Sequence, residues 1–172
     1  MKIIKTLIDN EYPFSEITHT RITLRCLAFN NKSEIALIKV KGNDIFGKRD
    51  YYEIPGGGLK EDESFIQGLK REIKEEVGCE ITDIKEIGII EDYYNLIKRK
   101  NINRYYIAKC VGDIFLPILE EYEKGIFEDI VWVSIDKAIA LYKSKTNTKL
   151  GRLLCNRELP ILEEVKTLLI EN

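Results

Sequence analysis

The stretch of sequence that decides the fold covers residues 57–79 and reads GGLKEDESFIQGLKREIKEEVGC. Ser64 is followed three residues later by Gln67, and this capping-box pattern predicts that a helix begins at Ser64. Gly78 is the residue type expected just beyond a helix end. The segment therefore predicts one helix that is entered from a glycine-rich loop.

The predicted helix carries apolar side chains and carboxylates on neighbouring stripes. Helical residues are spaced by about 100° around the axis, so residues three and four positions apart share a face. The apolar stripe consists of Ile66, Leu69, Ile73 and Val77. The carboxylate stripe consists of Glu72, Glu75 and Glu76. We therefore expect the helix to pack with one face and to present carboxylates with another.

These three glutamates repel one another unless a cation neutralises them. Glu72 has like charges at positions i+3 and i+4, and the other two lie in the last turn, where the helix dipole disfavours carboxylates. Only Glu75 is expected to gain an intrahelical cation, from Arg71. Solvated surface charges are the usual explanation for helical glutamates, but here the penalties agree in sign. We therefore predict a divalent-metal site on this helix.

All the side-chain ligands that this helix offers are oxygen atoms. Such a set suits Mg²⁺ or Mn²⁺ better than zinc, which favours Cys or His ligands. Hard divalent ions bind phosphate oxygens and lower the pKa of bound water. The helix therefore indicates phosphoryl or pyrophosphoryl chemistry, in which a glutamate of raised proton affinity could serve as a base.

Gly57, Glu63 and the run REIKEEVGC over residues 71–79 together resemble a complete Nudix box, the signature of the Nudix hydrolase superfamily. The resemblance implies an α/β/α sandwich with a mixed β-sheet, in the α/β (α+β) class, as a single domain over residues 1–172. It also implies hydrolysis of a nucleoside diphosphate linked to another group, by attack of water on a phosphorus of the pyrophosphate bridge.

The same resemblance implies roles for individual residues. The three glutamates would be both catalytic residues and metal ligands, and one of them could orient or deprotonate water. Glu63 and Arg71 would form a structural pair that ties the loop to the helix. The implied metal ligands are the backbone carbonyl of Gly56 and the carboxylates of Glu72, Glu75 and Glu76.

Three residues outside the box are candidates for substrate binding, namely Arg25, Lys39 and Tyr52. Arg21 and Arg25 alternate with apolar residues and should emerge on one sheet face, where an arginine could bind phosphate or form an ordinary salt bridge. Lys39 could neutralise phosphates while Tyr52 stacks on a base, although surface charges and a strand aromatic explain both residues nearly as well.

A later acidic segment offers candidates for one more carboxylate ligand, Glu123 and Glu128. A solvated acidic loop is the simpler explanation of these residues. Strands are expected at residues 21–29, 34–40, 51–54, 86–91, 104–111 and 127–134, the first two joined as a hairpin. Helices are expected at residues 134–142 and 159–170 in addition to the glutamate helix.

The composition limits the classes of function. With 172 residues, 27 Lys and Arg against 29 Asp and Glu, and a net charge of -2, the chain has no bulk electrostatic reason to bind nucleic acid or a membrane. Four widely spaced cysteines suggest neither a zinc cluster nor a disulfide scaffold. The N-terminus lacks a long apolar run, which makes a cytoplasmic location the default expectation. A homodimer is possible, because the N-terminal strand could pair within or between chains.

The sequence as a whole predicts a Mg²⁺-dependent Nudix-like pyrophosphohydrolase whose partner is a nucleotide substrate. Nucleoside triphosphates, oxidised ones included, are the first expectation for that substrate, and ADP-ribose or a nucleotide sugar is the alternative. A rival from another class is a Nudix-like module that senses a nucleotide without turning it over. Retention of all three box glutamates favours the enzyme.

Overall fold

The computed structural model describes residues 1–119 and 125–170. Within these residues, seven strands form one mixed sheet in the order β1-β5-β6-β2-β3-β4, with β7 paired to β3. Pairing is parallel between β1 and β5 and between β2 and β6, and antiparallel in the other pairs. The strands are β1 (Ile3–Leu7), β2 (His19–Phe29), β3 (Ile35–Asp44), β4 (Gly47–Glu53), β5 (Glu80–Tyr94), β6 (Arg99–Val111) and β7 (Phe127–Val133).

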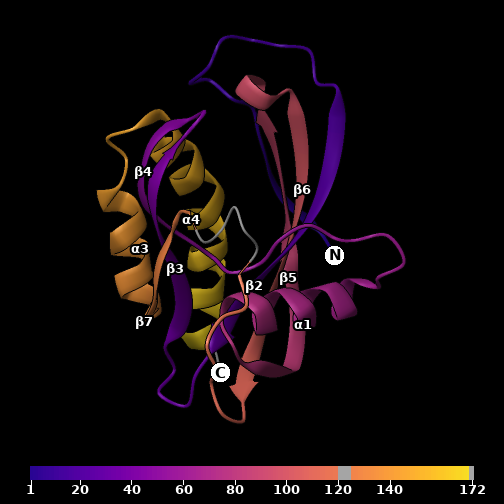
Figure 1. Cartoon of the computed structure of the whole chain (residues 1–172), viewed down its shortest axis with the longest axis vertical. Helices are drawn as coiled ribbons and strands as arrows, with labels where there is room; N and C mark the ends of the chain where they lie inside the picture. Colours follow the sequence, from indigo (N-terminus) through magenta and orange to yellow (C-terminus); the bar gives the residue numbers. More distant parts are fainter. Residues whose placement is uncertain (120–124, 171–172) are drawn as a thin grey trace.

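Helices cover both faces of the sheet (Figure 1). Helix α1 (Phe65–Glu76) lies on one face, and α3 (Ile135–Ser144) and α4 (Lys149–Ile170) lie on the other. A short 3-10 helix, η1 (Asn95–Ile97), connects β5 to β6. The α+β class predicted from the sequence is confirmed, with the mixed sheet between the helical layers.

The capping box that opens α1 is present as predicted. The Ser64 side chain accepts a hydrogen bond from the Gln67 amide, and the Gln67 side chain accepts one from the Ser64 amide. Leu69, Ile73 and Val77 are fully buried in the core. Ile66, which was expected to belong to the same stripe, is 41% exposed, because the side of α1 that turns inward carries two of the glutamates instead.

Helix α4 is longer than the sequence pattern indicates. It begins at Lys149 rather than at residue 159, and it continues through Pro160. Arg157 and Glu158 interrupt the apolar periodicity of this segment, yet both side chains are buried. Periodicity missed the first half of the helix because part of its inward face is charged.

The N-terminal strand pairs within the chain. β1 lies parallel to β5 at the edge of the sheet. Asp9, which follows it, accepts hydrogen bonds from the amides of Glu11, Tyr12 and Asn95. No helix in the described residues combines the length and the apolar composition needed to cross a membrane.

Strands β2 and β3 separate directly after their turn, and this separation makes room for the glycine-rich loop. Among the described residues, Phe29 and Ile35 are the only pair in register between them. Residues 55–57 occupy the vacated edge: Leu24 donates to the Gly57 carbonyl and Cys26 to the Pro55 carbonyl, both at 2.9 Å. The loop therefore lies beside β2 between the two helical layers.

Candidate active site

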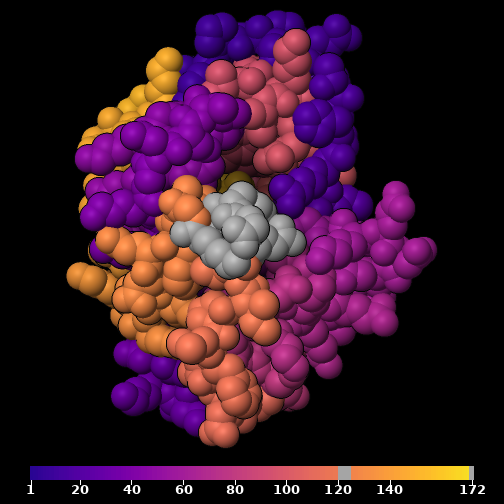
Figure 2. All heavy atoms as spheres, in the orientation of Figure 1, coloured from indigo at the N-terminus to yellow at the C-terminus, as the bar shows by residue number. Residues whose placement is uncertain are grey.

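A cavity of about 200 Å³ lies between the strands of the sheet and the start of α4, and the glycine-rich loop forms part of its wall. In Figure 2 the surface is hollowed between the segment containing β3 and β4 and the segment containing β5 and β6. The lining includes five arginines and two glutamates, so positive charge predominates. These charged residues are Arg21, Arg25, Arg49, Glu53, Glu76, Arg99 and Arg157.

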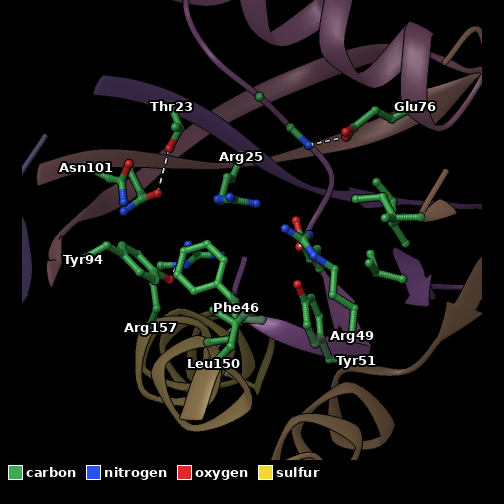
Figure 3. Close-up of a pocket in the computed structure, with 18 of the residues that line it drawn as sticks. Thr23, Arg25, Phe46, Arg49, Tyr51, Glu76, Tyr94, Asn101, Leu150 and Arg157 are labelled. Atoms are coloured by element: carbon green, nitrogen blue, oxygen red, sulfur yellow. Dashed lines mark hydrogen bonds and ion pairs between the residues drawn. The ribbon is translucent and has the colours of Figure 1, made fainter. Parts of the chain in front are cut away.

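Two of the three box glutamates turn inward toward this loop. Glu72 and Glu76 are 7% and 9% exposed, whereas the side chain of Glu75 is 30% exposed. Glu76 Oε2 accepts a hydrogen bond from the Gly56 amide at 2.6 Å. Figure 3 shows this contact at one side of the cavity. Glu76 is the member of the trio that lines the cavity.

Gly56 and Gly57 permit this close approach of carboxylate to backbone. Gly56 has φ +137°, and a Cβ atom there would lie 1.9 Å from the Leu24 carbonyl oxygen. A Cβ on Gly57 would lie 2.5 Å from a carboxylate oxygen of Glu72. Both inward-facing glutamates therefore rest against backbone that has no room for a side chain.

Arg71 donates hydrogen bonds to other carboxylates besides Glu63, its partner in the predicted structural pair. Its Nε and Nη2 donate to the two oxygens of Glu63 at 2.6 and 2.9 Å, so the structure contains that pair. Its Nη1 also donates to Glu72 at 2.8 Å and to Glu75 at 2.9 Å. The expectation that only Glu75 gains an intrahelical cation is wrong, because one guanidinium reaches both carboxylates.

The donor set fits a divalent ion, although its members do not already converge. In the part of the chain that the structure describes, no three carboxylate, imidazole or thiol groups are arranged around one point as ligands. Arg71 neutralises Glu72 and Glu75 in this arrangement. The nearby donors are carboxylate and backbone oxygens held against a loop without side chains, which is the chemistry that Mg²⁺ and Mn²⁺ prefer.

The Glu63–Arg71 pair predicts an acid-sensitive contribution to stability. The Arg71 guanidinium lowers the pKa of Glu63 from its ordinary 4.5 to about 2. Because the folded pKa is depressed, this contribution is fully present above pH 4.5 and is lost as the pH falls toward 2. We expect Glu63→Gln to be less stable than the wild type at pH 6, with the difference shrinking by pH 2.5. Urea denaturation at both pH values measures this, and an equal difference at both would contradict it.

Of the three substrate-binding candidates from the sequence, the structure places Arg25 in the cavity wall and the other two outside it. Arg21 and Arg25 face the cavity together, as their alternation predicts. Arg25 is 8% exposed, and its Nη1 donates to the Ile54 carbonyl at 2.9 Å. Its position therefore suits the proposed contact with substrate.

Lys39 and Tyr52 lie elsewhere. Neither lines the cavity, because they are cross-strand partners on the opposite side of their strands from Val40 and Tyr51, which do. The Lys39 ammonium binds Glu128 at 2.7 Å, and Tyr52 packs against the α3 and α4 core cluster. Their placement does not support a role in this cavity, nor does that of Glu128, which also binds Lys41. Glu123 lies outside the described residues.

Sequence reasoning missed several residues of the cavity wall. They include Arg99, Asn101 and Arg157. In residues 99–103 (RKNIN), Arg99, Asn101 and Asn103 recur with period two, and this spacing indicates that the three polar side chains share one face of the strand. The contribution of α4 had no such signal, because Arg157 reads as an ordinary surface charge.

Comparison with known families agrees with this geometry. A family model described as the NUDIX domain matches residues 19–154. The chain belongs to the NUDIX family. The match spans β2 through the first turns of α4, and so includes both the glutamate helix and most of the cavity wall.

Two named relatives give the family context. An RNA pyrophosphohydrolase of Hydrogenovibrio crunogenus is 33% identical over 98 residues, which cover 52% of this chain and 59% of the relative. An 8-oxo-dGTP diphosphatase of Buchnera aphidicola subsp. Schizaphis graminum is 34% identical over 97 residues, which cover 56% of this chain and 69% of the relative. This NUDIX chain thus matches little more than half of the first relative's length.

Solved structures share the fold. The E. coli ORF135 protein superposes with a TM-score of 0.62 at 18% identity, covering 88% of this chain and 91% of that one. The NUDIX domain of Shewanella oneidensis NrtR, solved with ADP ribose, superposes with a TM-score of 0.61 at 13% identity, covering 94% and 93%. At these identities the likeness concerns the fold alone.

Proposed function

We propose that this NUDIX protein is a Mg²⁺-dependent pyrophosphohydrolase that cleaves the pyrophosphate linkage of a nucleotide, with nucleoside triphosphates as the first substrate class. The observation that carries the proposal is the placement of two buried glutamates of α1 against the Gly56–Gly57 backbone, one of which, Glu76, lines an arginine-rich cavity. Carboxylates that can bind a metal and guanidinium groups that can bind phosphate therefore share one site.

Each part of the cavity has a task in this reaction. A divalent ion held by the glutamates, with Mn²⁺ as a possible substitute, would polarise the phosphoryl group and lower the pKa of bound water. Arg25, rigidly held by its bond to Ile54, can orient the phosphate chain and neutralise charge that develops on it. Glu76 is positioned to orient or deprotonate water at the cavity edge. The apolar side chains of the cavity wall can contact the remainder of the nucleotide.

The names of the relatives support hydrolysis of a phosphoanhydride and widen the choice of substrate. One is named for RNA and the other for an oxidised deoxynucleotide. The net charge of -2 argues against broad nucleic-acid binding, but the positive charges inside the cavity are local and suit any substrate that carries several phosphates.

A substrate panel tests the proposal. The purified chain is incubated with nucleoside triphosphates, 8-oxo-dGTP, ADP-ribose, nucleotide sugars and an RNA with a 5′-triphosphate end, in Mg²⁺ and in EDTA. We expect release of pyrophosphate or phosphate from the triphosphates in Mg²⁺, and none in EDTA. Calorimetric binding of a nucleotide without turnover in either Mg²⁺ or Mn²⁺ would instead favour the sensing module.

A further inference from the structure

Asn101 and Asn103 both line the cavity, but they differ in whether their side-chain oxygen accepts a hydrogen bond. Asn101 on β6 is 2% exposed and faces the cavity, and its Oδ1 has no partner among the described residues. Asn103, two residues further on the same strand face, is satisfied: its Oδ1 accepts from Thr23 at 2.7 Å and its Nδ2 donates to Asp92 at 2.8 Å. Since a buried unpaired acceptor destabilises the fold, Asn101 is better explained by a ligand than by packing.

Arg99 lies on the same strand face as Asn101 and, within the part of the chain that the structure describes, has an unpaired hydrogen-bond donor where Asn101 has an unpaired acceptor. It precedes Asn101 by two residues on the same strand face, lines the cavity, and has a buried Nε with no partner among the described residues. Burial and then the nearby charge of Arg21 lower the pKa of Arg99. Arg99 offers hydrogen-bond donors, whereas the Asn101 oxygen requires one, so the pair fits a ligand edge that has both acceptors and a donor.

The position of this pair within the cavity indicates which part of a nucleotide would reach it. In Figure 3, Asn101 and Glu76 lie at opposite sides of the cavity, with Arg25 between them in the view. Phe46, Tyr94 and Leu150 supply apolar and aromatic walls near the Asn101 side. If the phosphates lie at Glu76, as the proposed function requires, the base lies at Asn101.

The unpaired acceptor on Asn101 indicates that the ligand group bound there is a base and not a second phosphate. A fully ionised phosphate has no proton to donate, so it would leave Oδ1 unpaired. A 6-oxopurine offers the O6 and N7 acceptors that an arginine binds in bidentate fashion, and beside O6 it carries an N1–H donor. Adenine and cytosine place an amino group where the guanidinium requires an acceptor. We propose that Arg99 and Asn101 read the base edge of a 6-oxopurine nucleotide.

Binding in the absence of metal tests this inference without requiring turnover. Affinities for GTP, ITP, ATP and CTP are measured by calorimetry in EDTA. We expect GTP and ITP to bind about tenfold more tightly than ATP and CTP, as one uncompensated buried hydrogen bond implies. Asn101→Leu and Arg99→Met should each bring this ratio close to one. Asn31→Leu, the same change at an exposed turn position, should leave the ratio unchanged.

The fold should tolerate these substitutions. Leucine is close to asparagine in size and removes an unpaired buried acceptor, so Asn101→Leu is expected to melt at or above the wild-type Tm. Equal or tighter binding of ATP or CTP in the wild type, an unchanged ratio in both variants, or no binding of any of the four at millimolar concentration would overturn the assignment. If the base preference holds while the Mg²⁺ panel shows no hydrolysis, the proposed enzyme activity fails and the base-reading pair stands.

Discussion

Glu76→Gln is expected to lower kcat for nucleotide hydrolysis in Mg²⁺ by about 10³-fold, within the range seen when a general base is removed. The substitution keeps the shape of the side chain and an oxygen that can accept from the Gly56 amide, so the loop should remain in place. The substitution removes the negative charge at the cavity wall, which a divalent ion and an attacking water would both require in the proposed reaction.

Steady-state kinetics measure this effect, with KM expected to change far less than kcat. Glu61→Gln is the matched control, because Glu61 lies in the same box but is exposed and precedes the helix. The control should retain wild-type kcat. Undiminished hydrolysis by Glu76→Gln across the substrate panel would show that the assignment of this residue is wrong.

Glu158→Ala is expected to lower the free energy of unfolding by about 3–5 kcal/mol, as breaking a buried ion pair does. Glu158 is fully buried and accepts hydrogen bonds from Arg157 Nε at 2.7 Å and from the Tyr105 hydroxyl at 2.8 Å. Burial alone would lower the pKa of Arg157, and the Glu158 carboxylate, together with smaller effects of Tyr94, Tyr105 and Asp92, raises it above its ordinary value. Without it, the buried guanidinium keeps as its nearest anion Asp92, at 3.6 Å, and a hydrogen bond from Nη1 to the Tyr94 hydroxyl at 3.3 Å.

Urea denaturation measures this loss. Glu163→Ala on the same helix is the control, since Glu163 is exposed and lies 3.9 Å from Lys143, and its loss should change stability by at most about 1 kcal/mol. The double variant Arg157→Leu with Glu158→Leu should recover most of the stability, because it removes both charges together. If Glu158→Ala were as stable as the control, this pair would not be a structural element of the α4 face.

The glutamate helix illustrates how far local sequence reasoning reaches. Its start at Ser64, its end near Gly78 and its three carboxylates follow from capping, helical periodicity and the dipole, all of which act within a few residues. The same reasoning placed Ile66 on the packing stripe, where it was wrong, because Ile66 is 41% exposed. It gave no burial for Glu72 and Glu76, which the structure buries.

The substrate-binding candidates show where such reasoning ends. Alternation along β2 places Arg21 and Arg25 on one face correctly, because the period of two is a local property of a strand. Whether a face meets the cavity depends on neighbouring strands and helices. Lys39 and Tyr52 therefore had the right residue types on the wrong face, while Arg157 of α4 was overlooked.

The sequence by itself determined the family signature, the chemical types of the side chains in it and most element types, because these depend on residue identity and short-range spacing. The tertiary structure decided which polar groups share one cavity. The separation of β2 from β3 admits the glycine-rich loop beside β2, and so brings Glu76 of α1 into one cavity with arginines of β2, β4, β6 and α4. The cavity therefore gathers side chains as far apart in the sequence as Arg21 and Arg157. Strand pairing, rather than local propensity, determines that arrangement.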